Sequence, residues 1–306
     1  MMEIETLHTF DTEYSADSVE WCHQANHQEI FAVGTYQLEE TEEDSPSSRV
    51  RKGRIYLFSF DDQSNELLER QRLESDAILD QKWKEIGNVE HLIIATSIGK
   101  VEDYTLSEDN QLHKCQEIVL MLDVKENLVL SVDVDKDSSR VLASDSTGNL
   151  TLLDLGEPSP IVRQWKAHTI EYCEQIEAWT CAFDRYNKNV LYSGGDDSKF
   201  HIWDLREDKE AAKVQTASRD AGVTSFLSQS ENRLLVGSYD EKLNAYDLRN
   251  LKVPTDELNL NGGVWRIKVS SQNPSQLLVA CMYHNFSVVD CSSNLTLIAE
   301  YFEHKK

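Results

Sequence analysis

Residues 190–206 read VLYSGGDDSKFHIWDLR and contain the local pattern from which the fold is built. Two runs of β-forming residues, VLY and FHIW, flank the sequence GGDD, whose glycines and aspartates tolerate the positive φ angles of tight turns. The stretch therefore predicts a strand, a turn and a second strand. A single hairpin cannot bury its faces in water, so the pattern has to recur if the fold is to be stable.

The pattern occurs six times along the chain. The equivalent positions near the end of the second strand lie 46, 49, 50, 43 and 43 residues apart, and they are Ser59, Thr105, Asp154, Asp204, Asp247 and Asp290. A period of about 40–45 residues with four strands per unit is typical of β-propeller blades, and Trp-Asp at 203–204 is the dipeptide for which WD repeats are named. We predict an all-β WD40-type β-propeller that forms a single domain over residues 1–306, with its best-defined repeats over about 165–290.

The ends of the chain leave the closure of this propeller open. Residues 4–9 are predicted to form an outer strand leading into the first blade, and residues 295–303 the outer strand of a further blade. Either these two strands share the closure of six blades, or they belong to an incomplete seventh. Residues 38–52 lack a strand period and combine an acidic run with SPSS, so we expect a disordered acidic loop there.

Charge and cysteine content restrict the partners. With 30 basic and 54 acidic residues the chain carries a formal charge of −24, which repels nucleic-acid phosphates and attracts basic protein surfaces, although solubility alone also accounts for it. The six cysteines form no C-x-x-C pair, which argues against a metal site and for a reducing compartment. No signal peptide or apolar run of about 18 residues is present. We expect a cytoplasmic monomer without metal, cofactor, nucleic acid or membrane.

One set of polar side chains is predicted to stabilise the fourth blade. Its spacing matches the tetrad that pins turn to strand in many WD repeats, and its members are His168, Ser193, Asp197 and Trp203. Buried polar groups need partners, and these four supply them to one another. We therefore assign the set a structural role ahead of a catalytic one, and Asp240 receives the same interpretation because it has the same offset from Tyr246.

Other charged residues are harder to explain by structure alone. Asp196 and Glu241 add a second carboxylate to the turns of two consecutive blades, where simple solvation is the alternative. In GGVWRIK, at 262–268, strand alternation places Trp265 and Arg266 on opposite faces. A partly buried Arg266 needs a carboxylate, and Asp240 or Glu241 are candidates; the pair is then either structural or functional.

The stretch EAWTCAF, at 177–183, has an acid where a blade strand favours apolar residues, with Glu177 and Trp179 on one face. Common hydrolase signatures, such as G-x-S-x-G and H-E-x-x-H, are absent from the sequence, as is a glycine-rich phosphate loop. The residues alone therefore favour an interaction module over an enzyme.

A longer combination of motifs resembles the diphthine methyltransferase family, WD-repeat proteins of diphthamide biosynthesis. The resemblance covers about residues 165–290, where the motifs are KAH at 166–168, EAW at 177–179, YSGGDD at 192–197, GSYDE at 237–241 and GGVWRIK at 262–268. Despite its name, this family is held to be an esterase that removes the methyl ester from methylated diphthine on translation elongation factor 2. The resemblance thus implies a carboxylic ester hydrolase with elongation factor 2 as its protein substrate.

The resemblance also implies where a site lies. The substrate carries a quaternary ammonium group near the ester, and such a cation favours aromatic faces and carboxylates. A carboxylate or a histidine is expected to activate water, with a guanidinium or backbone N–H groups stabilising the oxyanion. The catalytic candidates are Asp196, Glu241, Arg266 and His168. The substrate-binding candidates are Trp179, Tyr239, Gly262, Gly263 and Trp265.

The alternative function is a non-catalytic scaffold or a cullin-ligase substrate receptor. The sequence WDLR, from Trp203 to Arg206, resembles the W-D-x-R motif of propellers that dock to the cullin-ligase adaptor. A weaker copy, YDLR, runs from Tyr246 to Arg249. An assay of methyl-ester loss separates the two functions.

Overall fold

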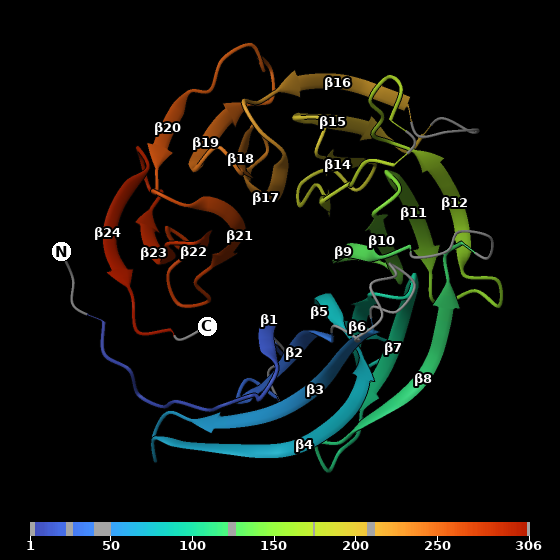
Figure 1. Ribbon diagram of the computed structural model, residues 1–306, viewed down its shortest axis with the longest axis vertical. Coiled ribbons are helices and arrows are strands. Elements are labelled where there is room, and N and C mark those ends of the chain that lie inside the picture. Colours follow the sequence, from blue (N-terminus) through green and yellow to red (C-terminus); the bar gives the residue numbers. More distant parts are fainter. Residues whose placement is uncertain are drawn as a thin grey trace. The chain divides into compact units, whose positions relative to one another are not determined.

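The computed structural model describes residues 4–22, 27–39, 50–121, 127–173, 175–206 and 212–304 (Figure 1). Every regular element in these ranges is a β-strand, and the 24 strands form six four-stranded sheets. In each sheet the strands are neighbours in chain order, which is the arrangement of propeller blades. The prediction of an all-β, six-bladed WD-type β-propeller is therefore confirmed. Within the described residues, no helix is long and apolar enough to cross a membrane.

The first three blades are built from β1 to β12. Blade 1 contains β1 (Ser15–Trp21), β2 (Ile30–Glu39), β3 (Val50–Asp61) and β4 (Glu66–Asp76). Blade 2 contains β5 (Ile78–Ile86), β6 (Val89–Thr96), β7 (Lys100–Leu106) and β8 (Leu112–Val119). Blade 3 contains β9 (Val129–Val134), β10 (Arg140–Asp145), β11 (Asn149–Asp154) and β12 (Ile161–Lys166).

The last three blades carry the residues of functional interest. Blade 4 contains β13 (Thr180–Phe183), β14 (Val190–Gly194), β15 (Lys199–Asp204) and β16 (Ala212–Ser218). Blade 5 contains β17 (Val223–Ser230), β18 (Arg233–Ser238), β19 (Lys242–Asp247) and β20 (Asp256–Asn259). Blade 6 contains β21 (Gly263–Val269), β22 (Gln276–Met282), β23 (Asn285–Asp290) and β24 (Thr296–Tyr301).

The described chain divides into two compact units. The N-terminal unit comprises residues 7–146 and 151–162, and its buried side chains include Ile30, Leu57 and Leu92. The C-terminal unit comprises residues 163–304 together with 4–6 and 147–150. Its apolar clusters join consecutive blades, because one contains Tyr192 of blade 4 and Val236 of blade 5, and another contains Leu235 of blade 5 and Val264 of blade 6. All predicted site residues lie in this C-terminal unit.

The predicted loop at 38–52 is wrong at both of its ends. Strand β2 extends to Glu39 and β3 begins at Val50, with Leu38 paired to Arg51 across the two strands. An ion pair of 2.7 Å between Lys52 and Glu39 supports this extension of the hairpin. Charged residues can therefore form a strand here because a partner strand of complementary charge lies opposite. Residues 40–49 of the predicted loop lie outside the described residues.

Two predicted outer strands also need correction. Residues 4–9 are not a strand, since β4 takes the outer position of blade 1 by pairing with β3. Residues 295–303 do not start a further blade, since β24 pairs with β23 and completes blade 6. The hairpin motif identifies only the inner strands of a blade. The last outer strand was therefore assigned to a further blade. The described residues contain six complete blades and no strand of a seventh.

Candidate functional site

The hairpin of residues 190–206 forms as predicted. Strand β14 pairs with β15 in the antiparallel register Leu191 to Trp203 and Ser193 to His201. Its turn depends on a residue without a side chain, because a Cβ atom on Gly195 would lie 2.7 Å from the ring of His168. The close approach of this ring to the backbone positions the tetrad.

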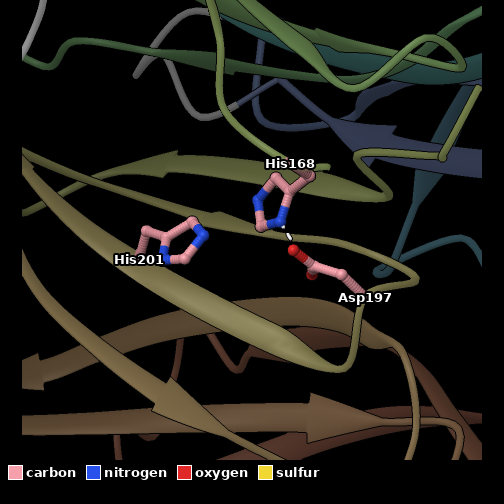
Figure 2. Close-up of side chains that lie close together, drawn as sticks. All are labelled: His168, Asp197 and His201. Atoms are coloured by element: carbon pink, nitrogen blue, oxygen red, sulfur yellow. Dashed lines mark hydrogen bonds and ion pairs between the residues drawn. The ribbon is translucent and has the colours of Figure 1, made fainter. Parts of the chain in front are cut away.

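The structure brings the four tetrad side chains into one hydrogen-bonded chain in blade 4. The fully buried His168 places Nδ1 2.9 Å from Asp197 Oδ1 and Nε2 2.8 Å from Ser193 Oγ, and Figure 2 shows the contact with Asp197. Trp203 Nε1 donates to Ser193 Oγ at 2.9 Å. Both nitrogens of His168 thus have partners inside the blade, which favours its structural role over water activation.

The electrostatics of Asp197 agree with a structural role. Burial raises the pKa of Asp197, but the hydrogen bond and the charge of His168 outweigh it, so this pKa lies below its ordinary value. His201 stacks on His168 with ring centroids 4.8 Å apart and places its own Nδ1 2.8 Å from Thr216 Oγ1 (Figure 2). One possible metal-ligand atom from each of His168, Asp197 and His201 lies within 4.8 Å of the other two. Hydrogen bonds already account for this arrangement.

Asp240 is likewise part of the framework of its blade. It forms an ion pair of 2.6 Å with Arg219, and the two side chains are only 6% and 7% exposed. Arg219 also donates to Tyr246 Oη at 3.0 Å. Of the two candidate partners of Arg266, Asp240 is therefore already neutralised by Arg219. Sequence reasoning missed Arg219, which lies in a connecting segment and belongs to no motif.

Three aromatic rings from consecutive blades contact one another. Trp179 lies just before β13 of blade 4, Tyr239 lies in the β18–β19 turn of blade 5, and Trp265 lies in β21 of blade 6. The ring centroids are 5.8 Å apart for Trp179 and Tyr239, 5.7 Å for Trp179 and Trp265, and 6.0 Å for Tyr239 and Trp265. We call these three residues the aromatic cluster. None of the three side chains is fully buried.

A β-bulge places Trp265 in this cluster. Val264 pairs with Cys281 and Arg266 pairs with Ala280, so Trp265 has no residue opposite it in β22. Such an extra residue breaks the alternation of a strand and redirects side chains. The prediction that Trp265 and Arg266 face opposite sides is therefore wrong, since the guanidinium carbon of Arg266 lies 4.8 Å from the ring centroid of Trp265.

The two preceding blades have residues at the position equivalent to Trp265, at the start of the innermost strand. In blade 5, Thr224 is the extra residue between the pairs of Val223 and Ser225. In blade 4, Trp179 directly precedes Thr180, the first paired residue of β13. Glu177 and Trp179 consequently lie in the segment that leads into the strand, and the prediction that they share a strand face is wrong.

Charged groups surround the aromatic cluster. The exposed Asp196 accepts a hydrogen bond of 3.3 Å from Trp179 Nε1. The half-buried Arg266 donates from Nη1 to the backbone carbonyls of Thr224 and Trp265, at 3.1 Å each. Burial and then the negative charge of Asp196 raise the pKa of Tyr239 above its ordinary value, so its phenol stays protonated at neutral pH.

The remaining predicted residues lie around this group at different distances. A Cβ atom on Gly263 would contact the Tyr239 ring at 3.3 Å, whereas one on Gly262 would lie 2.6 Å from Met282 O in the neighbouring strand. Glu241 follows Asp240 in the β18–β19 turn, where it is exposed and has a φ of 67°. Its side chain forms no hydrogen bond or ion pair with any residue that the structure describes. The structure therefore brings Asp196, and not Glu241, against the aromatic cluster.

The two W-D-x-R-like sequences form the same local contact. Arg206 pairs with Asp204 at 2.5 Å, and Arg249 pairs with Asp247 at 2.6 Å. The hydrogen bonds from the arginines lower the pKa of each aspartate to about 2. A contact that repeats in consecutive blades is sufficiently explained by the turn that follows each strand. Docking of a ligase adaptor to Trp203–Arg206 stays a prediction.

Fold and side chains together define a WD-repeat β-propeller with an aromatic cluster and an adjacent carboxylate on three consecutive blades. The chain is 35% identical over an alignment of 321 positions to "Diphthine methyltransferase" of Homo sapiens, covering 95% of this chain and 69% of that protein. It is 33% identical over 314 residues to "Diphthine methyltransferase homolog" of Dictyostelium discoideum, covering 90% and 81%. The chain belongs to the diphthine methyltransferase family, which are enzymes of diphthamide biosynthesis.

Two further comparisons complete this result. No family model matches the chain. Among solved structures, a chain of "Crystal Structure of Mitotic Checkpoint Complex" aligns with a TM-score of 0.65 at 14% identity, covering 99% of this chain and 87% of that one. At this identity the likeness shows the fold alone. The family resemblance of residues 165–290 is thus confirmed and extends over nearly the whole chain.

Proposed function

We propose that this chain removes the methyl ester from methylated diphthine on translation elongation factor 2, at a site formed by the aromatic cluster, Asp196 and Arg266. In this hydrolysis a water oxygen bonds to the ester carbonyl carbon and the bond from that carbon to the methoxy oxygen breaks. The products are a carboxylate, methanol and a proton. The observation that carries the proposal is the mutual contact of Trp179, Tyr239 and Trp265, with the carboxylate of Asp196 beside them.

The aromatic cluster suits the quaternary ammonium group of the substrate. Such a cation has no N–H to donate, so it is recognised by aromatic faces and by negative charge, and each desolvated face contributes about 1–2 kcal/mol. Asp196 and Glu177 both act electrostatically on Tyr239, which places two carboxylates near the cluster. Trp179 and Trp265 then hold the cation by their rings, while the carboxylates supply the counter-charge.

Asp196 is our candidate for the general base. Its carboxylate is exposed to water, and its contact with the indole N–H of Trp179 fixes its orientation next to the bound cation. Positioned general bases contribute about 10²–10⁴ in rate. The guanidinium of Arg266 is our candidate for stabilising the oxyanion, because its contacts with two carbonyls and the Trp265 ring hold it at the cluster.

The cellular setting follows from the same proposal. All six cysteines are free, as expected for a reducing compartment such as the cytoplasm. The formal charge of −24 steers the chain toward basic surfaces of a protein substrate. We therefore propose that the chain acts as a monomer in the cytoplasm and binds elongation factor 2 transiently.

The test is methyl loss from elongation factor 2 that carries methylated diphthine, followed by mass spectrometry with purified chain. Asp196→Asn and Arg266→Lys are each expected to lower the rate about 100-fold or more. Glu241→Gln is the matched control, because Glu241 is an exposed turn carboxylate on the next blade without a side-chain partner among the described residues. Equal rates for Asp196→Asn and Glu241→Gln would remove Asp196 from the proposed site.

A further inference from the structure

Two tyrosines of the C-terminal unit are held in an unfavourable backbone conformation and are largely exposed. Tyr172 has φ of 66° and is 97% exposed, and Tyr283 has φ of 61° and is 87% exposed. Both values lie in the left-handed region, where bulky side chains are rare because Cβ crowds the backbone. The combination of strain and exposure is what singles out these two residues.

Asparagine is better suited than tyrosine to a backbone position with positive φ. Among the residues that the structure describes, ten non-glycine residues have positive φ, and five of them are asparagines, namely Asn65, Asn88, Asn110, Asn261 and Asn285. Asparagine tolerates this conformation because its short side chain can bond to the nearby backbone. A tyrosine ring that stays almost fully in water gains little from burial in return for the strain. Strain of this kind persists at sites where a residue has another role.

Both tyrosines lie on segments that also supply the cluster. Tyr172 belongs to the connection between β12 and β13, which continues to Trp179. Tyr283 lies in the β22–β23 turn of blade 6, close enough to act electrostatically on the phenol of Tyr239. The connection that holds Tyr172 contacts the turn of Asp196 at both of its ends, because His168 Nδ1 lies 2.9 Å from Asp197 Oδ1 and the N–H of Asp196 donates to Glu177 O at 2.9 Å. The two tyrosines thus lie on segments that adjoin the cluster in blade 4 and in blade 6.

We propose that Tyr172 and Tyr283 are docking residues that contact the loop of the substrate protein on either side of its modified histidine. This inference rests on the proposed function, since it takes its occupant from the reaction at the adjacent aromatic cluster. Tyrosine is suited to this task, because it offers a large, stiff and amphipathic surface at low cost in conformational entropy. A side chain that enters the cluster brings its flanking backbone to the segments that carry the two rings.

The variants Tyr172→Asn and Tyr283→Asn separate docking from folding. Each is expected to raise KM for the protein substrate about tenfold with little change in kcat, as for removal of an interface tyrosine. The Tm of each variant is expected to equal or exceed that of the wild type, because asparagine relieves the strain at positive φ. A purely structural tyrosine gives the opposite result, a lower Tm with an unchanged KM.

Tyr186→Asn is the matched control. Tyr186 is also exposed, but it lies in the β13–β14 connection, at the opposite end of blade 4 from Asp196, where its hydroxyl donates to Gln229 O at 2.8 Å. This variant is expected to keep the wild-type KM, with at most a small fall in Tm. A tenfold rise in KM for Tyr186→Asn as well would overturn the assignment to the two flanking tyrosines.

A binding measurement keeps this inference distinct from the reaction itself. The probe is elongation factor 2 that carries demethylated diphthine, and its affinity for each variant is measured by interferometry. Weaker binding by Tyr172→Asn and Tyr283→Asn supports docking even if the wild type releases no methanol, an outcome that would refute only the proposed hydrolysis. Wild-type affinity and wild-type KM in both variants would overturn the docking role and leave the hydrolysis standing. If the wild type neither binds nor hydrolyses, both proposals fall.

Discussion

The indole of Trp179 meets the phenol ring of Tyr239 edge to face, with centroids 5.8 Å apart and an interplanar angle of 85°. The two residues belong to consecutive blades, and Trp265 of the following blade touches both. Each blade thus supplies one ring, and the cluster forms only when blades 4, 5 and 6 pack together. The proposed site therefore depends directly on how these three blades pack.

Removing one ring should weaken the reaction in proportion to the aromatic face that is lost. We expect Trp265→Ala to lower kcat/KM for elongation factor 2 about tenfold or more, and Trp265→Phe to lower it less, because phenylalanine retains a smaller π face. Steady-state kinetics of methyl release measure the effect. Trp21→Ala is the control, since Trp21 contacts only a tilted Phe31 ring among the aromatic pairs of the described N-terminal unit. Equal loss in Trp265→Ala and Trp265→Phe would argue against a cation held by this ring.

Gly222 sets the distance between Asp196 and Tyr239. A Cβ atom there would lie 2.9 Å from Asp196 Oδ1 and 3.1 Å from Tyr239 Cδ2. Gly222→Ala should therefore displace the carboxylate and lower kcat about tenfold, with a change in Tm of only a few degrees. Gly156→Ala, whose Cβ would meet the movable Ser139 hydroxyl at 3.1 Å, is expected to leave kcat unchanged. A normal kcat in Gly222→Ala would show that the position of Asp196 is not critical.

The buried pair of Arg219 and Asp240 should behave as a unit. Asp240→Leu or Arg219→Leu leaves one charge buried without its partner, and each is expected to lower the free energy of unfolding by about 3–5 kcal/mol. The double variant should cost clearly less than the two single changes together, because it leaves no charge behind. Urea unfolding of the four proteins measures this coupling. Simple additivity would contradict a shared structural role.

Asp197 should make stability depend on pH in the acid range. Its pKa in the folded chain lies below the unfolded value of about 3.9, so its contribution is fully present above that value. The contribution is then lost as pH falls through the folded pKa. The difference in unfolding free energy between the wild type and Asp197→Asn should shrink as pH falls below about 4. A difference that does not change with pH would contradict the lowered pKa.

The sequence carried more information about the blades than about the contacts between them. The hairpin at 190–206 has fixed spacing, turn residues and alternation, and these determine both strands and the partners of His168. The ends of the strands were harder to predict, because the extension of β2 and β3 into the acidic segment depends on charge pairing between Glu39 and Lys52. Local patterns do not record such cross-strand contacts.

The site itself was only partly predictable. The residues of the aromatic cluster were among the candidates, but their mutual contact depends on the bulge at Trp265, which strict alternation excludes. The same bulge brings Arg266 over the indole, whereas strict alternation placed the two side chains on opposite faces. The true partner of Asp240, Arg219, is 21 residues away in sequence and carries no motif signal. Contacts between blades therefore had to come from the structure.

The most direct test of the central claim is hydrolysis in water enriched in oxygen-18, with elongation factor 2 bearing methylated diphthine as the substrate. Our account predicts that wild-type chain releases the methyl group and that the heavy oxygen appears in the new carboxylate, because water adds to the carbonyl carbon. Asp196→Asn should slow this incorporation, and Glu241→Gln should not. Heavy oxygen in the methanol instead of the carboxylate, or no methyl loss with wild-type chain, would contradict the account.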